Sequence, residues 1–257
     1  MKALHGMSSE AASDMRRRGH EDALTFALSI DLDKDYKNDP QAKKDVIDPS
    51  GDAHSVKSGK KKWQVFLYSL ARFESDDAFA AMNGIGGLLE SSIKSFPATF
   101  AEYQQNKPEA KERLRQFMRQ LAEKLQDKRR LRAFFDKSLF NAGEVNYLTV
   151  RHEVKFRVFA RKDIVAALAD NLEVCNSVAR SAGQVPEQKV IFRYKGKNLA
   201  ELEMRNDSTT HYREVRLNML TPRAMELLLE KILFVRKFSE MVYLYGAAAK
   251  TFGRWKS

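Results

Sequence analysis

A predicted β-hairpin at residues 43–58 is the feature that most restricts how this chain can fold. The segments KKDVID (43–48) and AHSVKS (53–58) are typical of short strands, and PSGD (49–52) between them is typical of a tight turn. If the turn is centred on Ser50, Asp45 and Ser55 each lie five residues from it and face each other. The sequence therefore predicts a hairpin with a defined register.

The two faces of this hairpin differ in chemistry. Alternate residues of a strand share a face, so Ser55 and Lys57 point the same way, and the predicted register adds Asp45 to them. Val46 and Val56 point to the other face, where an apolar core is expected. One face therefore presents a carboxylate, a hydroxyl and an amine.

His54 and Cys175 are interpreted without a functional role. His54 alternates with Ser55 and falls on the apolar face, which favours a structural role. Cys175 is the only cysteine, so the chain has no internal disulfide and no cysteine-based zinc site. A single cysteine fits a reducing, cytoplasmic setting.

The rest of the chain reads as a mixture of helices and strands. Helix is expected from Gly19, where Ala23, Ala27 and Ile30 form an apolar stripe, and residues 1–18 are expected to be flexible. Further helices are predicted at 60–75, 108–139, 163–171 and 221–249, short helices at 78–105, and strands at 146–161, 189–196, 198–207 and 211–220. The fold class is therefore α/β, of the α+β kind.

Net charge points to the class of partner. The chain has 45 Lys and Arg against 34 Asp and Glu, a formal charge of +11. A basic surface releases the counter-ions of a polyanion on binding, which favours nucleic acid. There is no run of about 18 apolar residues, so no membrane span is expected, and the first residues do not resemble a signal peptide.

The polar face of the hairpin has the groups that phosphodiester hydrolysis needs. A hard cation must be held by oxygens near the scissile phosphate, a water must be activated, and charge growing on phosphorus must be offset. Asp45 can hold Mg²⁺, with a backbone carbonyl near Val56 as a further ligand. Lys57 can orient the attacking water and offset the charge.

These residues resemble the PD-(D/E)xK nuclease superfamily. An Asp is followed about a dozen residues later by an x-Lys pair on the second strand of a hairpin. The piece SVKSGKKKWQ is similar to type II restriction endonucleases of the Ser-x-Lys variety, and the resemblance covers roughly residues 19–70. Two positions depart from the usual pattern, since Ser55 stands at the acidic position and Lys44 precedes Asp45 in place of proline.

The resemblance implies a fold and further site residues. It implies a single restriction-endonuclease-like domain over residues 19–257, with a catalytic core at about 19–75 and DNA-contacting elements at about 108–220. The expected fold is a mixed central sheet flanked by helices, with additional C-terminal strands and a long C-terminal helix. Glu21 stands where a helix glutamate of the family often contributes, and Gln64 is expected on the helix after the hairpin. The second metal ligand stays open between Glu21, a main-chain oxygen and water.

The implied activity is Mg²⁺-dependent, sequence-specific cleavage of double-stranded DNA by a type II restriction enzyme. A double-strand cut at a palindrome implies a two-fold homodimer. A restriction system also implies a cognate DNA methyltransferase.

Basic and forked side chains are the candidate DNA contacts. Arg reads guanine and Asn or Gln reads adenine in the major groove, while Lys binds phosphate. The candidates are Lys60, Lys61, Lys62, Arg193, Lys195, Lys197, Arg205, Asn206, Asp207, His211, Tyr212, Arg213 and Arg216. Asn, Asp and Ser are also common in exposed turns for structural reasons alone.

Other interpretations remain open. Asp45 and Lys57 could form only a cross-strand ion pair, and Asp48 or Asp52 could replace Asp45 if the register differs. The chain could also be a DNA-binding protein without catalysis on the same scaffold, an interpretation that Ser55 favours. A third alternative is an RNA-processing or toxin-like nuclease.

Overall fold

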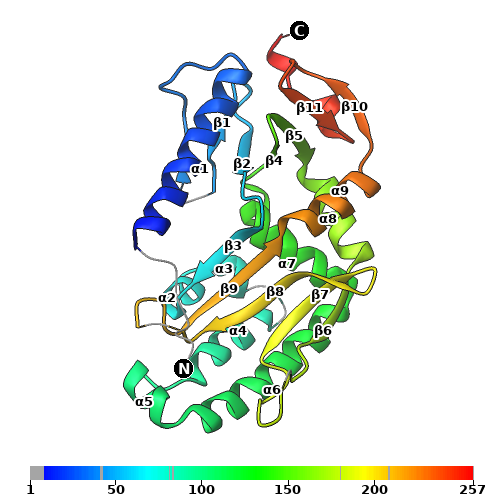
Figure 1. The fold of residues 1–257 in the computed structure, drawn as a ribbon. Helices are drawn as coiled ribbons and strands as arrows, with labels where there is room; N and C mark the ends of the chain where they lie inside the picture. Colours follow the sequence, from blue (N-terminus) through cyan, green and yellow to red (C-terminus); the bar gives the residue numbers. More distant parts are fainter. Residues whose placement is uncertain are drawn as a thin grey trace. The chain divides into compact units, whose positions relative to one another are not determined.

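The protein is a mixed α/β chain with two β-sheets (Figure 1). Its structure, a computed structural model, describes residues 9–40, 43–80, 82, 84–179, 181–207 and 209–256. Of the stretch 1–18 that was expected to be flexible, residues 1–8 lie outside the described part of the chain, and residues 9–18 are helical, so the expectation is wrong there. The chain forms two compact units, where the sequence suggested one domain. We call them the mixed-sheet unit, within residues 9–63, 135–170 and 224–256, and the antiparallel-sheet unit, within residues 64–134 and 171–223.

A six-stranded sheet forms the centre of the mixed-sheet unit. Its strands follow the order β1-β2-β4-β5-β11-β10. β2 runs parallel to β4 and β11 runs parallel to β5, while the other neighbours are antiparallel. The strands are β1 (Val46–Ile47), β2 (Ala53–Lys57), β4 (Tyr147–His152), β5 (Lys155–Ala160), β10 (Phe234–Lys237) and β11 (Val242–Tyr245).

Helix α1 (Ser9–Ser29) packs its apolar stripe against one face of this sheet. Ala23, Ala27 and Ile30 are buried as the sequence predicted, because residues three and four apart lie on one side of a helix. They join Val158 and other sheet residues in a single core cluster. The helix begins at Ser9, ten residues before the start predicted at Gly19.

The antiparallel-sheet unit contains five strands in the order β3-β9-β8-β7-β6. They are β3 (Lys62–Tyr68), β6 (Glu173–Asn176), β7 (Lys189–Tyr194), β8 (Lys197–Arg205) and β9 (Glu214–Leu220). The helices within this unit are α2 (Leu70–Glu74), α3 (Asp77–Ala80), α4 (Ile85–Lys94), α5 (Phe100–Gln105) and α6 (Lys107–Gln126). The strands predicted at 189–196, 198–207 and 211–220 are confirmed as β7, β8 and β9.

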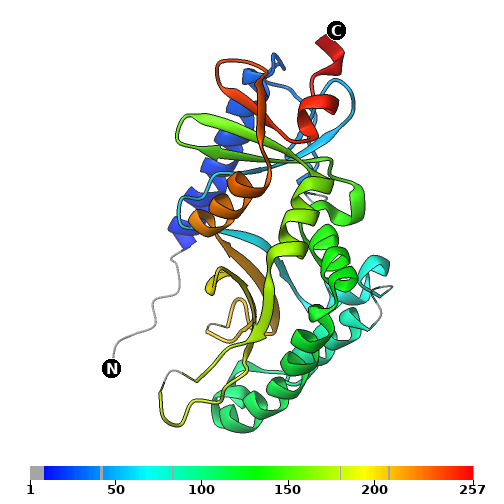
Figure 2. The ribbon, with the colours of Figure 1, turned by 90° about the vertical axis from the view of Figure 1, so that its right-hand side faces the viewer.

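Helices cover one face of this five-stranded sheet. Figure 2 shows α4 and α6 on one side of the strands, and α6 contacts β6 and β7. Helix α6 buries a stripe formed by Leu114, Met118 and Leu121. On β8, Leu202 is buried while its neighbour Glu201 is only half-buried, as expected when alternate side chains point to opposite faces.

The helix predicted at 60–75 is wrong over its first part. Residues 62–68 form β3, which pairs with β9, and only Leu70–Glu74 is helical as α2. The sequence KWQVFLY is rich in aromatic and β-branched residues, which favour a strand when a partner strand is present. That partner lies about 150 residues further along the chain, beyond the reach of a local pattern.

The long C-terminal helix predicted at 221–249 is also wrong. Helix α9 (Thr221–Lys231) ends early, and the chain continues through β10 and β11 to the short helix α10 (Ala248–Thr251) and a 3₁₀ turn at Arg254–Lys256. β11 has the sequence VYLY and pairs with β5 in register with Phe156–Phe159. Pairing inside the sheet therefore overrides the helical spacing of these apolar residues.

The long basic helix predicted at 108–139 is two helices, α6 and α7 (Lys128–Phe140). They are separated at Asp127, whose backbone is extended and whose Oδ1 accepts hydrogen bonds from the amides of Arg129 and Arg130. An Asp whose side chain accepts hydrogen bonds from the first amides of a helix caps the N-terminus of that helix, so a second helix begins here.

The segment 146–161, predicted as one strand, is a hairpin of β4 and β5, and α8 (Arg161–Asn171) follows it. Within the described chain, no helix is both long enough and apolar enough to cross a membrane.

Candidate active site

The predicted hairpin register is confirmed. Val46 pairs with His54 and Ile47 with Ala53, which places Asp45 opposite Ser55. The strand pairings of β1 cover only two residues, because the chain turns away toward Lys44, which pairs with Asp39. Asp45 therefore lies just beyond the end of β1, beside β2.

The Asp45 carboxylate replaces the missing part of β1. Its Oδ2 accepts a hydrogen bond of 2.7 Å from the backbone amide of Val56 and one of 3.4 Å from Ser55 Oγ. The amide and carbonyl of one strand residue point to the same side of the strand. The Val56 carbonyl therefore faces the same edge of β2 as the Val56 amide that the Asp45 carboxylate binds.

Ser55 and Lys57 share the face of the sheet opposite the α1 core. The pairings of β2, β4, β5 and β11 place Lys57 in one row with Val150, Arg157 and Tyr243. The adjacent row on the other face contains Val158, a member of the core cluster, and Val56, which packs against it. Val46 and Val56 thus face the core as predicted, but the rows of Ser55 and Lys57 continue through the buried Leu148, Phe159 and Val150, so that side of the sheet is largely apolar.

The ammonium group of Lys57 has no protein partner among the described residues. No hydrogen bond or ion pair joins it to Asp45 or to another described side chain, although the residue is half-buried. A cross-strand ion pair between Asp45 and Lys57 is thus not formed in the described part of the chain. The charge of Lys57 remains available to an anion.

Glu21 does not join this group in the structure. It lies near the middle of α1 with its side chain 63% exposed, and its carboxylate is 3.8 Å from Arg17 Nε. Among the described residues, no group of three or more Asp, Glu, His or Cys side chains could hold a metal ion. The donors for a cation at Asp45 are therefore one carboxylate and the Val56 carbonyl. Such an all-oxygen set with few protein ligands fits Mg²⁺, which keeps several of its waters.

Three exposed lysines follow directly after the site. Lys60, Lys61 and Lys62 are all exposed, and Lys60 lies only three residues after Lys57. Along the chain Lys60 is at most about 11 Å and Lys62 at most about 18 Å from Lys57 between Cα atoms. The turn before β3 is tight at Gly59, where an added Cβ would lie 2.7 Å from the Lys62 carbonyl oxygen. Glycine at this position therefore allows the lysine turn to fold back on itself.

Gln64 lies on a strand, whereas the sequence placed it on a helix. It is exposed within β3, the first residue of the antiparallel-sheet unit. The helical spacing of Trp63, Phe66 and Leu67 suggested the wrong element, for the reason given above.

A buried polar network lies behind the hairpin and was missed by sequence reasoning. His54 is fully buried, with Nδ1 at 2.9 Å from Thr149 Oγ1 and Nε2 at 3.4 Å from Asp48 Oδ2. A carboxylate only accepts, so Nε2–H donates to Asp48 and Nδ1 accepts from the Thr149 hydroxyl. Burial lowers the pKa of His54, and the nearby Asp48 and Asp52 only partly oppose this. His54 is therefore neutral at pH 7.

Asp48 and Asp52, the alternative acids, are engaged in this network. Asp48 Oδ1 accepts from the amides of Ser50 and Asp52, which fixes the hairpin turn. Tyr147 donates to Asp52 Oδ2 at 3.2 Å, and its hydroxyl lies 2.8 Å from Thr251 Oγ1. Burial and the neighbouring Asp48 raise the pKa of Asp52. Both carboxylates thus shape the turn, away from the edge that Asp45 occupies.

Most of the later DNA-contact candidates make contacts within the antiparallel-sheet unit. Arg205 binds Asp207 at 2.7 Å, His211 lies 2.9 Å from Glu214, and Arg193 donates to Asn198. Asn206 donates to the hydroxyl of Tyr103, Tyr212 donates to the Pro97 carbonyl, Arg216 pairs with Glu203, and Lys195 lies over the ring of Tyr194. Lys197 is exposed at a hairpin turn, and the Arg213 Nε is buried without a hydrogen-bond partner.

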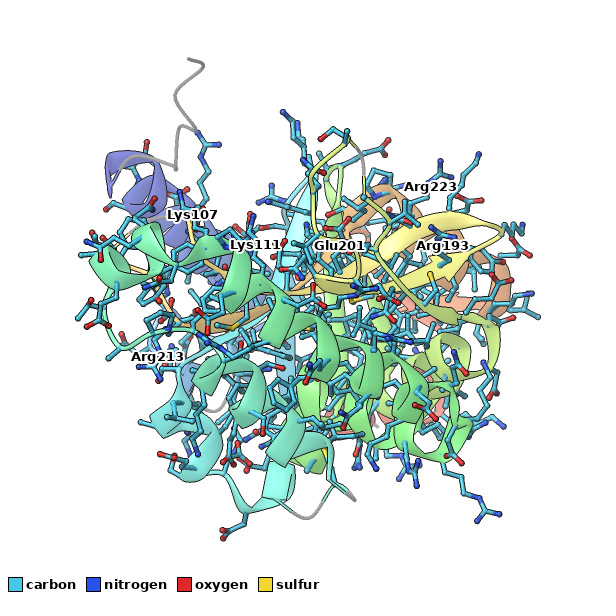
Figure 3. The ribbon with its side chains drawn as sticks, turned by 90° about the horizontal axis from the view of Figure 1, so that it is seen from below. Lys107, Lys111, Arg193, Glu201, Arg213 and Arg223 are labelled. Atoms are coloured by element: carbon cyan, nitrogen blue, oxygen red, sulfur yellow. The ribbon has the colours of Figure 1, made fainter. Side chains whose placement is uncertain are left out.

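A charged ladder crosses the face of this sheet opposite α6. Lys189 lies 2.9 Å from Glu201 and 2.5 Å from Glu203, and Glu203 also binds Arg216. Burial acts to raise the pKa of Glu203, but Lys189 and Arg216 outweigh it and lower that pKa. Figure 3 shows Arg193 and Glu201 on these strands and Lys107 and Lys111 on α6. Because positive and negative groups pair here, the ladder has far less free cationic charge than its count of Lys and Arg suggests.

Comparisons with protein-family models, with curated proteins and with solved structures find no match for this chain. The functional argument therefore depends on the site itself.

Proposed function

We propose that the protein is a metal-dependent DNA endonuclease that cleaves at the edge of β2, of the type II restriction class. The observation that carries the proposal is the Asp45 carboxylate, which is held by the Val56 amide of β2, the strand that also carries Lys57. A carboxylate for a metal ion and an amine without a described protein partner are two of the groups that hydrolysis of a phosphodiester needs.

Each group has a separate role in this proposal. Asp45 and the Val56 carbonyl would hold Mg²⁺, which supplies positive charge and a more acidic bound water. Ser55 donates to the Asp45 carboxylate and fixes its orientation. Lys57 offsets the negative charge that grows on the phosphate, and it orients the attacking water. The exposed Lys60, Lys61 and Lys62 bind phosphates beside the scissile one. Glu21 and Gln64 remain supporting candidates.

Net charge and the lysine turn favour DNA or RNA over other phosphodiesters. The net charge of +11 favours association with a polyanion, and three exposed lysines follow Lys57 within five residues. Double-stranded DNA is the substrate that the resemblance to restriction enzymes supports. The test incubates purified protein with plasmid DNA and with RNA, each with Mg²⁺ or with EDTA. We expect metal-dependent cutting of DNA, and cutting of RNA alone would indicate an RNA-processing enzyme.

A DNA-binding protein without catalysis is the second candidate. It is favoured by Ser55 at the acidic position and by the hydrogen bonds that tie the Asp45 carboxylate to β2. In that case the Asp45 carboxylate has only a structural role, which is to accept the hydrogen bond of the Val56 amide in place of a backbone carbonyl of a neighbouring strand. DNA binding without cutting across many substrates and metals would support it.

A two-fold homodimer is the proposed assembly. β10 is the last strand of the six-stranded sheet, and all four of its residues are exposed. Phe234 is 50% exposed and Val235 54%, beside Leu233 at 75%. An exposed apolar edge strand pairs readily with another strand, and two copies of β10 related by a two-fold axis can pair antiparallel. Because β1 and β2 lie at the opposite end of the strand order from β10, pairing through β10 leaves the β2 edge of each copy free for DNA. A methyltransferase that protects the same sequence would accompany the enzyme.

A further inference from the structure

A basic cavity lies near the C-terminal end of the mixed-sheet unit, on residues to which no role has been assigned. Its volume is about 360 Å³, and its lining includes Arg236, Lys250, Arg254, Lys256, Phe238 and Phe252. They come from β10, from the segment after it, and from α10 with the turn that follows, which lie together in Figure 1. The lining contains four cations and no acid.

Backbone contacts hold two of these cations in place. Arg236 donates to the carbonyls of Ala249 and Phe252, and Arg254 donates to the carbonyl of Lys250 at 3.0 Å. A carbonyl partner orients a guanidinium but does not neutralise it. Lys250 is exposed and its ammonium has no partner among the described residues. Lys256 is paired with the carboxylate of Asp31.

Aromatic packing gives the cavity a firm wall. Phe252 is buried and lies 4.9 Å from Phe238 between ring centroids. Gly253 has a φ of +83°, and an added Cβ would lie 2.5 Å from the Phe238 ring. The close approach of this backbone to Phe238 therefore requires glycine, and it holds the basic turn against the sheet.

We propose that this cavity binds a backbone phosphate of DNA outside the cleavage site. The cavity is lined by the guanidinium groups of Arg236 and Arg254 and by the ammonium group of Lys250, and no acidic residue lines it. Such a set of cationic donors can bind a phosphate. The inference depends on the proposed function only in taking DNA as the ligand. A phosphate held here positions the duplex and carries no sequence information.

Lys250→Ala tests the proposal by the salt dependence of DNA binding. The side chain is exposed, so its removal leaves the fold intact, as circular dichroism can verify. Duplex binding is measured by fluorescence anisotropy in EDTA, which prevents cleavage, at several salt concentrations. Each phosphate contact contributes about −0.9 to the slope of log K against log salt, so we expect the slope to fall in magnitude by about one.

Lys34→Ala is the matched control. Lys34 is an exposed lysine of the same unit outside the cavity lining, and its removal changes the net charge equally. We expect its slope to match that of the wild type. If Lys250→Ala keeps the wild-type slope, or if Lys34→Ala lowers it equally, the cavity is not a phosphate site although DNA binding stands. If the wild type binds no DNA, the proposed function fails together with this inference.

Discussion

Replacing Asp45 by asparagine separates a catalytic role from a structural one. The Asp45 carboxylate accepts from the Val56 amide at 2.7 Å, and an asparagine Oδ1 can accept from the same amide. A hydrogen bond to a charged group contributes about 1.5–3 kcal/mol and a neutral one about 0.5–1.5 kcal/mol. Asp45→Asn should therefore lower the free energy of unfolding by only about 1 kcal/mol, which is about 2–4 °C in Tm for a chain of this size.

The effect on cleavage should be much larger. The substitution removes the one carboxylate that the described residues offer at the proposed site. Losing one group that stabilises a transition state lowers the rate by at least about 10²-fold, which corresponds to about 2.7 kcal/mol. Asp45→Ala should abolish cleavage as well, and it should destabilise more, by about 1–3 kcal/mol, because the Val56 amide loses its acceptor.

Plasmid cleavage in Mg²⁺ and thermal unfolding of the same samples measure the two effects together. Asp33→Asn, a change of the same kind at an exposed loop residue, is the control and should leave both unchanged. If Asp45→Asn cuts DNA at the wild-type rate, the carboxylate serves only to complete the strand, and the assignment of the site is wrong.

Three further predictions concern pH, the lysine turn and assembly. The pKa of His54 is lower in the folded state than in the unfolded state, so the unfolded state takes up a proton at a higher pH. The free energy of unfolding therefore has its full value above about pH 6.5. Below that pH it falls, by at most about 1.4 kcal/mol per pH unit. Denaturant unfolding at pH 7.5 and 5.5 should show this loss, and His54→Asn should reduce it; an unchanged loss in that variant would rule out His54 as the source. Gly59→Ala should push the lysine turn away from the Lys62 carbonyl and weaken duplex binding in EDTA several-fold, while Gly19→Ala, where added bulk meets nothing within 4 Å, should not. Phe234→Glu should shift the protein from dimer to monomer in sedimentation velocity, and a wild type that is monomeric at high concentration would contradict pairing through β10.

The sequence predicts local structure better than it predicts pairing partners. The hairpin register followed from the turn chemistry of Pro49–Asp52, which is contained within a few residues. The strands at 62–68 and 242–245 could not be found in the same way, because they pair with β9 and β5, which are far away in the sequence. The apolar residues of these two segments recur at a spacing that suits a helix, but they form strands of a sheet.

The candidate site shows the same limit. The alternation of β2 was sufficient to place Ser55 and Lys57 on one face, but it could not show that the Asp45 carboxylate binds the Val56 amide. The network of His54, Asp48 and Thr149 joins residues 95 positions apart, so a single sequence contains no signal for it. Arg216 looked like a free DNA contact because its partner Glu203 becomes a neighbour only when the sheet forms, whereas the partners of Arg205 and His211 lie two and three residues further along the chain.

Cleavage by wild-type protein and by Lys57→Ala, on the same DNA, tests the central claim most directly. We expect the wild-type protein to cut duplex DNA in Mg²⁺ and not in EDTA. We expect the Lys57→Ala variant to bind the same DNA with nearly wild-type affinity and not to cut it. The absence of metal-dependent cutting by the wild type on every DNA tested, or undiminished cutting by Lys57→Ala, would contradict it.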